Sequence, residues 1–271
     1  MLPQETLINH IKQVCLGDDN ITSAMLHGSF SNGKADIYSD LDVFVYTKDD
    51  ALDAFDKSEW FRRIAPVIWH MPHEFGFDYV VFEGLIRGEF HFHKNCDIEA
   101  ALAQNCRFCI FPSLESMLLL DKTGDLTKFL QPYIGEPPPF SISEEEIQSL
   151  VHHYIFYFHV GYEHIRRGDY MRAMDFLKYA HYHINQIVRL LEGATSEWFS
   201  VNKSLERDLS AESYARFVSC TSSGEPDSLK RAYRNSWIWV MEMLPKLRER
   251  ATISVPEELL SALNALVTRD E

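Results

Sequence analysis

The chain has 271 residues, of which 46% are hydrophobic and 24% are charged, with 12 Gly and 11 Pro. These values are typical of a globular protein with one large or two modest domains, and they exclude collagenous, low-complexity and disordered chains. The 26 basic and 40 acidic residues give a net charge of −14. Such an acidic chain lacks the positive surface that neutralises phosphates, so nucleic acid is not an expected partner.

Short strands and short helices are predicted to alternate over residues 1–135. Apolar residues at helical spacing after Pro3, among them Leu7 and Ile11, predict an amphipathic helix. Runs rich in β-branched and aromatic residues, bounded by turn signals, predict strands at 21–27, 41–46, 67–70, 78–82 and 85–93. Because some strands are joined by helices and others directly, we expect an α+β fold with a mixed sheet and flanking helices.

Three consecutive prolines follow this region, in Glu136-Pro-Pro-Pro-Phe140. Proline continues neither a helix nor a central strand, so residues 136–142 are predicted to be a stiff linker to a second domain, 143–271. Ser143 and Glu146 have the spacing of a helix capping box. Helical patterns then predict five helices, at 143–166, 169–191, 203–219, 227–250 and 256–268. The second domain is therefore expected to be an all-helical bundle.

The chain is expected to be cytoplasmic, with no membrane partner. Its first residues have no basic segment followed by an apolar one, and no apolar run approaches the ~20 residues that span a bilayer. The cysteines number only five, and an odd, small number argues against a disulfide framework. Cys106-Arg-Phe-Cys109 has the spacing of a redox or metal-binding motif, but no second pair accompanies it, so buried or half-buried thiols are the favoured interpretation.

The segment from His27 to Tyr46 carries the strongest chemical signal. Asp40 and Asp42 are two residues apart at the start of a predicted strand, so they share one face. Two adjacent carboxylates repel each other unless a cation lies between them, and Mg²⁺ commonly binds to one or two carboxylates together with substrate phosphates. Gly28 and Ser29 end the preceding strand. A glycine permits close approach of the backbone, and N–H groups and a hydroxyl bind a terminal phosphate.

Glu89 is the one acid in the middle of a strand whose alternate residues are aromatic. Burial of a carboxylate there is costly unless it is paired or near a metal. Asp78 and Glu83 are competing candidates, but they lie at strand ends, where a solvated role is expected. A pair between Glu89 and Arg87 or a histidine is the structural alternative to a catalytic role.

The joint pattern resembles the signature of the nucleotidyltransferase superfamily that includes DNA polymerase β and kanamycin nucleotidyltransferase. The alternative is a plain β-turn at Gly28-Ser29 beside a solvated strand edge. The superfamily usually takes a third carboxylate from a later strand, and by position Glu89 corresponds to the catalytic base. Asp40 and Asp42 correspond to the metal ligands. The resemblance implies an Mg²⁺ cofactor, two ions in all, and a nucleoside triphosphate as co-substrate.

More specifically, the chain resembles the lincosamide nucleotidyltransferases, in the longer two-domain branch that modifies lincomycin and clindamycin. The strings that carry this likeness are Leu26-His-Gly-Ser-Phe30, Asp36-Ile-Tyr-Ser-Asp40, Leu85-Ile-Arg-Gly-Glu-Phe-His-Phe92, Met117–Gly124 and Arg167–Tyr170. The family's activity is transfer of a nucleoside monophosphate to a hydroxyl of the lincosamide sugar, which inactivates the antibiotic. Related enzymes are commonly dimeric, so a homodimer is expected. The helical domain is expected to contribute to acceptor binding and to dimerisation.

Weaker features surround this constellation. Lys34 is a candidate contact for the phosphates, although loop lysines are usually solvated. Arg87, His91 and His93 are expected to line the cleft, and zinc chelation by the two histidines is the alternative. Aromatic and histidine residues in the helical region form either an acceptor-binding face or ordinary bundle core. A cluster of large residues forms either core or a dimer face: Trp237, Trp239, Met241 and Met243.

Two other functions stay open. The first is nucleotidylation of another small hydroxylated antibiotic, such as an aminoglycoside, because a polycation suits an acidic cleft. The second is a non-catalytic binding protein with the nucleotidyltransferase fold, paired with a helical toxin in the manner of an antitoxin. Such a protein is expected to lack part of the carboxylate set, whereas this chain has all three acids.

Overall fold

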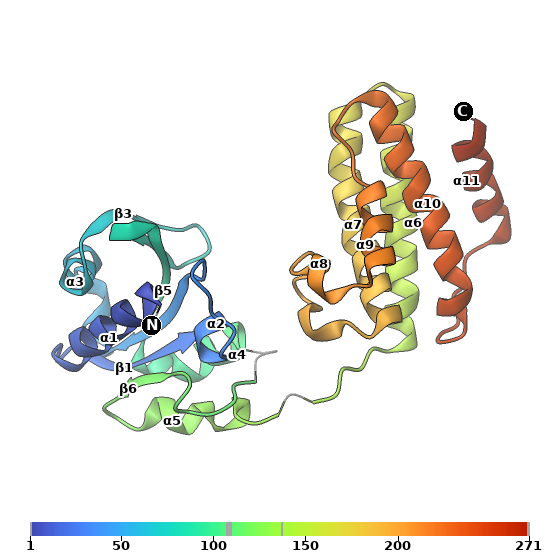
Figure 1. Cartoon of the computed structure of the whole chain (residues 1–271). Helices are drawn as coiled ribbons and strands as arrows, with labels where there is room; N and C mark the ends of the chain where they lie inside the picture. The colour runs from blue at the N-terminus through green and yellow to red at the C-terminus, as the bar shows by residue number, and fades with distance from the viewer. Residues whose placement is uncertain (1, 107–109, 137, 270–271) are drawn as a thin grey trace. The chain divides into compact units, whose positions relative to one another are not determined.

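A computed structural model describes residues 2–106, 110–136 and 138–269. The chain divides into two compact units, an N-terminal unit of Met1–Pro138 and a C-terminal unit of Pro139–Glu271 (Figure 1). The described residues of the predicted linker form no helix or strand, and Pro137 lies outside the described ranges. Among the helices described, none is both long enough and apolar enough to cross a membrane.

The N-terminal unit is built on a six-stranded sheet with the strand order β3-β4-β5-β2-β1-β6. Its strands are β1 (Ile21–His27), β2 (Leu41–Thr47), β3 (Val67–Pro72), β4 (Asp78–Phe82), β5 (Ile86–Lys94) and β6 (Leu118–Asp121). β2 and β5 run parallel, whereas the four other strand pairs that the structure describes are antiparallel. The mixed sheet confirms the α+β prediction. β6 was not predicted, because its three consecutive leucines carry no alternation of polar and apolar residues.

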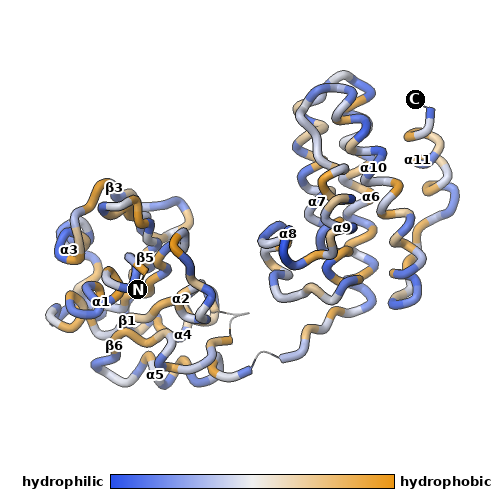
Figure 2. Tube along the Cα trace, viewed as in Figure 1, coloured by the Kyte–Doolittle hydropathy of each residue, from blue (hydrophilic) through white to orange (hydrophobic). Residues whose placement is uncertain are grey.

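Helices cover both faces of this sheet. They are α1 (Pro3–Leu16), α2 (Gly28–Ser31), α3 (Lys57–Ile64), α4 (Ile98–Asn105) and α5 (Asp125–Leu130). Alternate residues of β2 divide between two cores, as expected for a strand that is buried on both sides. Val43 and Val45 pack with α1 and α3, and Phe44 and Tyr46 pack with α4 and α5. Figure 2 shows hydrophobic residues along β1 and also along the edge strand β3.

β5 has one apolar and one polar side, as predicted. Phe90 and Phe92 are buried in the core beneath α1 and α3. Glu89, His91 and His93 alternate with them and are half-buried on the opposite face. The polar side of β5 therefore lies on the same face of the sheet as Phe44 and its neighbours in β2.

The C-terminal unit is helical, as predicted. Its helices are α6 (Glu144–Arg166), α7 (Tyr170–Glu192), α8 (Leu205–Asp208), α9 (Ala211–Ser219), α10 (Pro226–Arg248) and α11 (Glu257–Arg269). The capping box at the start of α6 is present, since the Ser143 hydroxyl accepts from the Glu146 N–H at 3.1 Å. The single helix predicted over 203–219 was wrong. Ser210 separates α8 from α9, because its hydroxyl accepts from the Ser213 N–H and begins a new helix.

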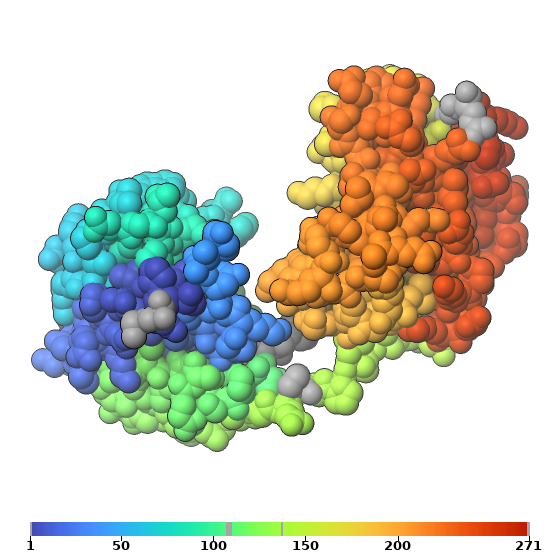
Figure 3. Space-filling model, in the orientation of Figure 1, coloured from blue at the N-terminus to red at the C-terminus, as the bar shows by residue number. Residues whose placement is uncertain are grey.

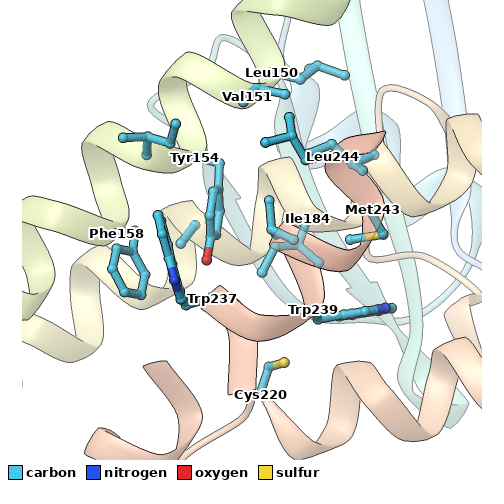
Figure 4. Packing of buried hydrophobic residues seen from close by; sticks show 14 of the residues in the cluster. Leu150, Val151, Tyr154, Phe158, Ile184, Cys220, Trp237, Trp239, Met243 and Leu244 are labelled. Atoms are coloured by element: carbon cyan, nitrogen blue, oxygen red, sulfur yellow. The ribbon is translucent and has the colours of Figure 1, made fainter. Parts of the chain in front are cut away.

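Aromatic residues fill the core of this unit. Tyr154, Phe158 and Trp237 meet between α6 and α10, with Trp239 and Met243 in the same cluster (Figure 4). Trp237, Trp239 and Met243 are therefore core residues. In the space-filling view, the orange segment that includes α9 forms much of the visible surface of this unit (Figure 3). Among the cysteines, Cys106 is buried, and Cys109 lies outside the described residues.

Candidate active site

Strand pairing and one ion pair bring together the three acidic residues predicted from the sequence. Asp42 in β2 and Glu89 in β5 are direct partners across the parallel pair, so their side chains stand next to each other on one face. Asp40 precedes β2 and forms an ion pair with Arg87, with 3.3 Å between the Asp40 carboxylate and the guanidinium. Arg87 lies two residues before Glu89 and therefore shares its face. The cluster has three carboxylates and one guanidinium.

The carboxylates disturb one another's ionisation. The pKa of Asp42 is raised to about 6, chiefly by burial and then by the negative charges of Asp40 and Glu89, against opposing effects of His27 and Arg87. Burial and the Asp40 carboxylate also raise the pKa of Glu89, and His73 and Arg87 oppose that shift. Negative charge is thus in excess at this point of the sheet. A cation placed between the carboxylates would relieve the repulsion.

The donor set fits a hard cation such as Mg²⁺, because Asp40 and Asp42 offer carboxylate oxygens. Within the described ranges, no three His, Cys, Asp or Glu residues are grouped closely enough to hold a metal ion by themselves. Mg²⁺ usually keeps several waters and completes its coordination with substrate phosphates. The residues therefore fit an ion that binds together with a nucleotide, held by Asp40 and Asp42.

The glycine turn lies directly against this cluster. His27, the last residue of β1, is the strand partner of Asp42, and the chain then turns into the four-residue α2. Gly28 has a φ of +67°, and a Cβ atom at that position would lie 2.0 Å from Oδ2 of Asp42. Both the backbone conformation and the neighbouring carboxylate therefore require glycine here.

Ser29 offers an unused polar group beside the glycine. Its hydroxyl is buried and has no hydrogen-bond partner within the part of the chain that the structure describes. An unpaired buried hydroxyl destabilises a fold by about 1–3 kcal/mol. A phosphate oxygen bound at this turn would accept that hydrogen bond, so the orphaned hydroxyl fits the anion site that the sequence predicts.

Gln4 supports the loop that carries Asp40, and the sequence analysis missed it. Its side chain is buried, and its Nε2 donates to the carbonyl oxygens of Ile37 at 3.1 Å and Ser39 at 2.9 Å. Gln4 continues the buried stripe of α1 at a spacing of three residues before Leu7. A polar residue on an otherwise apolar helix face was the available signal, because a buried amide must find partners.

The other predicted site residues lie outside the carboxylate cluster. The side chain of Lys34 is exposed, and its backbone N–H donates to the Ser29 carbonyl at 3.0 Å. The ring of His91 stacks on Phe44 with 4.4 Å between centroids, and His93 lies 6.0 Å from the same ring. Burial lowers the pKa of His91 to about 4 and also lowers that of His93. At neutral pH these rings therefore form an uncharged layer beside the carboxylates.

Asp78 differs from its predicted role. It was expected to be solvated at a strand end, but its side chain is buried. One carboxylate oxygen accepts from Nζ of Lys57 at 2.7 Å, and the other lies 2.8 Å from Nε2 of His70. Glu83, the other competitor, is exposed as expected. Asp78 therefore joins α3 to the β3–β4 hairpin and is not part of the carboxylate cluster.

Two family matches divide along the same boundary as the fold. Residues 9–66, which include Gly28, Asp40 and Asp42, match the family described as "Polymerase beta, Nucleotidyltransferase". Together with the sheet and the carboxylate cluster, this match identifies the N-terminal unit as a nucleotidyltransferase-type domain. Residues 143–266 match the family described as "Lincosamide nucleotidyltransferase-like, C-terminal domain". The chain thus combines a polymerase β-type nucleotidyltransferase domain with a lincosamide nucleotidyltransferase-like C-terminal domain, and the resemblance drawn from the sequence is confirmed.

Two solved structures are similar at low identity. The aminoglycoside 6-adenyltransferase from Bacillus subtilis is 13% identical, with 98% of each chain covered and a TM-score of 0.42. A nucleotidyltransferase-like protein from Exiguobacterium sibiricum 255-15 is 14% identical, with 90% of this chain and 74% of that chain covered and a TM-score of 0.36. No curated protein matches the chain significantly. At this level of similarity, neither structure determines the substrate.

Proposed function

We propose that this protein transfers a nucleoside monophosphate from a nucleoside triphosphate to a hydroxyl of a lincosamide antibiotic, in an Mg²⁺-dependent reaction that inactivates the drug. The observation that carries the proposal is the side-by-side pairing of Asp42 and Glu89, next to the Gly28–Ser29 turn. The match of residues 143–266 supports a lincosamide as the acceptor, because that family is described by its likeness to lincosamide nucleotidyltransferases.

In this mechanism each residue has one task. Glu89 accepts the proton of the acceptor hydroxyl while the oxygen attacks the α-phosphorus. A new O–P bond forms, the bond between the α-phosphorus and the bridging oxygen breaks, and pyrophosphate leaves. Gly28 and Ser29 hold the terminal phosphate through backbone N–H groups and the hydroxyl. Mg²⁺, held by Asp40 and Asp42, would supply positive charge that stabilises the transition state and the leaving group.

The surroundings of Glu89 suit a general base. A base works best when its pKa approaches the working pH, and burial beside Asp40 raises the pKa of Glu89. The neutral rings of His91 and Phe44 keep the neighbouring face of the sheet poorly solvated. Electrostatic interactions are stronger in such surroundings than in water. Arg87 stays paired with Asp40 and thereby limits the excess of negative charge.

We further propose that the helical domain contributes to acceptor binding and that the protein is a homodimer. An exposed aromatic face on α6 and α7 supports the first part, since Tyr179 stacks on Tyr157 at 5.1 Å while remaining 54% exposed. The dimer rests on the family resemblance. Light scattering of the purified protein tests it directly, because a mass of 31.5 kDa in solution would contradict a dimer.

Mass spectrometry of candidate acceptors tests the activity. Lincomycin, clindamycin and kanamycin are each incubated with the protein, MgCl₂ and each nucleoside triphosphate in turn. We expect a nucleoside-monophosphate adduct on a lincosamide that disappears with Asp40→Asn, with Glu89→Gln and with EDTA. Asp53→Asn is the matched control, because Asp53 is an exposed carboxylate of the same unit.

The pattern of adducts separates the alternatives. An adduct on kanamycin alone would keep the chemistry and reject the lincosamide. An adduct that persists in Glu89→Gln would reject Glu89 as the base. If no triphosphate gives an adduct on any acceptor, the proposed activity is wrong, and the antitoxin-like binding protein becomes the favoured interpretation.

A further inference from the structure

Strand pairing places aromatic residues next to Glu89, on the side away from Asp42. Tyr79 in β4 is the direct partner of Glu89, whose other partner is Asp42. In the adjacent row, Trp69 in β3 is the partner of Val81. The rings of Trp69 and Tyr79 meet edge to face, with 5.7 Å between their centroids and 72° between their planes. Contact between these rings puts both on the face of the sheet that carries Glu89.

This aromatic pair is open to solvent. The side chain of Trp69 is 54% exposed, and Tyr79 is half-buried. β3 is the outermost strand at this end of the sheet, as the strand order requires and as Figure 1 shows. Polar groups border the pair on its inner side, where Arg87 and Glu89 lie in β5. The surface thus combines a large apolar area with a carboxylate, which is the composition of a small-molecule subsite.

The order of the strands indicates which substrate meets this surface. The Gly28–Ser29 turn follows β1, on one side of the carboxylates, and the aromatic pair lies on β4 and β3, on the other side. Glu89 in β5 lies between them. In-line attack puts the acceptor oxygen opposite the leaving pyrophosphate across the α-phosphorus, and the base must lie beside that oxygen. The aromatic side is therefore the acceptor side.

We propose that Trp69 and Tyr79 form the platform on which the sugar ring of the acceptor stacks, with its reactive hydroxyl directed toward Glu89. The inference rests on the proposed function and deepens it by assigning residues to the acceptor subsite. A sugar ring presents a face of C–H groups that packs on an aromatic ring, and its hydroxyls project outward from that face. Trp offers the largest apolar area for such packing at a small conformational cost. Trp69 and Tyr79 determine specificity and take no part in proton transfer.

The test separates acceptor binding from nucleotide binding. For Trp69→Ala and Tyr79→Ala, kcat and both KM values are measured with the acceptor that the wild-type protein modifies. We expect the KM for the acceptor to rise about tenfold in Trp69→Ala, while the KM for the nucleotide stays within about twofold. Trp69→Phe should restore most of the affinity. Leu16→Ala is the control, since Leu16 is equally exposed at 54% and belongs to α1, which packs on the opposite face.

Two kinetic results would overturn the platform while leaving the proposed function intact. One is an acceptor KM unchanged in both alanine variants, and the other is a rise confined to the nucleotide KM. Circular dichroism melts confirm that each variant is folded. If Trp69→Ala is unfolded, Trp69→Leu and Trp69→Phe are measured in its place. The KM for the acceptor is then expected to rise about tenfold in Trp69→Leu and to stay near the wild-type value in Trp69→Phe.

Failure of the proposed function gives a different pattern. If the wild-type protein modifies no acceptor, binding of labelled lincomycin is measured by equilibrium dialysis with Glu89→Gln and with Glu89→Gln/Trp69→Ala. Weaker binding to the double variant would support the platform as a binding surface. Equal binding to the two proteins, or none to either, would overturn it.

Discussion

Gly28 is the residue at which backbone conformation and charge constrain the chain together. Its φ of +67° favours glycine, and its Cα lies so close to Asp42 that a methyl group would overlap the carboxylate. Gly33 has nearly the same φ, +69°, but nothing lies within 4 Å of the Cβ position there. Both positions favour glycine because of their positive φ, but only Gly28 also lacks space for a side chain.

Gly28→Ala is expected to abolish nucleotide transfer by displacing Asp42, and to lower the free energy of unfolding by about 2 kcal/mol. Gly33→Ala should lower it by only about 1 kcal/mol and leave the transfer rate within a few-fold of wild type. Urea unfolding and the adduct assay measure both quantities. Equal loss of activity in the two variants would mean that the transfer rate depends on the backbone conformation of the turn and not on the contact between Gly28 and Asp42.

Asp42 predicts a pH dependence of stability in the absence of metal. Its pKa in the folded protein, about 6, exceeds the ordinary value of 3.8, so the folded state holds a proton that the unfolded chain has already released between those pH values. The free energy of unfolding therefore falls as the pH rises from about 4 to 6, on account of this group. Asparagine at position 42 has no titrating carboxyl, so the substitution removes this pH-dependent loss of stability.

In EDTA, Asp42→Asn should match the wild type in stability near pH 4 and exceed it by about 2 kcal/mol at pH 7.5. Urea unfolding at the two pH values measures the difference. Asp53→Asn, which replaces an exposed carboxylate, should show no comparable gain. A stability difference for Asp42→Asn that does not change with pH would contradict the raised pKa.

Residues whose role depends on a local pattern were accessible from the sequence. Asp42 and Glu89 follow from alternation within a strand, and Gly28 from a turn signal between two strands. Gln4 and Tyr79 were missed because their positions depend on contacts across 35 and 10 residues of chain, respectively. Alternation gives the face of a strand to which a side chain belongs, but it does not give the neighbouring strand or the register.

At the scale of elements, an ion pair between buried Asp78 and half-buried Lys57 fixes the β3–β4 hairpin to α3. The side chain of Asp78 is 6% exposed, and it pairs with Lys57 and His70. Removal of Asp78 would leave both partners without their acceptor in a poorly solvated place. The hairpin also carries Trp69 and Tyr79, so its position determines where the aromatic platform lies.

Asp78→Ala is expected to lower the free energy of unfolding by about 1–3 kcal/mol, because it removes the buried acceptor of Lys57 and His70. It should also raise the KM for the acceptor more than that for the nucleotide. Chemical denaturation and steady-state kinetics provide the two measurements. Glu83→Ala, at an exposed position just beyond β4, serves as the control. A loss confined to kcat would contradict a positioning role for the hairpin.

Elements with strong periodicity were predicted within a few residues, among them α1, β4, α6 and α11. The break between α8 and α9 was missed because both segments carry helical patterns, and the break depends on Ser210. Ser210 is held by Glu192, whose carboxylate accepts from its N–H at 2.8 Å and from its hydroxyl at 2.7 Å. The break between α8 and α9 thus depends on a contact between residues 18 positions apart, and the hydrophobic pattern of a single segment does not reveal such a contact.

At the scale of the whole molecule, each unit has its own hydrophobic core. The clusters around Phe90 and Phe44 belong to the N-terminal unit, and the cluster around Trp237 belongs to the C-terminal unit. The boundary falls between Pro138 and Pro139, within a stretch that the sequence predicts as a linker. Each unit should therefore fold by itself.

Fragments 1–138 and 139–271, expressed separately, are each expected to unfold cooperatively on heating, the second with a strongly helical circular dichroism spectrum. The N-terminal fragment should still bind a nucleoside triphosphate in the presence of Mg²⁺, measured by calorimetry, because Gly28, Ser29, Asp40 and Asp42 all belong to it. The same fragment with Asp42→Asn is the control. A broad, non-cooperative melt of either fragment would contradict two independent cores.

The parallel pairing of β2 with β5 has a consequence for how such a protein can diversify. The chain between the two strands, residues 48–85, includes α3 and the β3–β4 hairpin, and the hairpin lies outside β5 at the end of the sheet. In the proposed function, the residues for proton transfer and those of the acceptor surface are thus encoded in separate stretches of sequence. On the proposed assignment, exchange of the hairpin between related chains would alter the acceptor that is recognised while Asp42 and Glu89 keep their pairing.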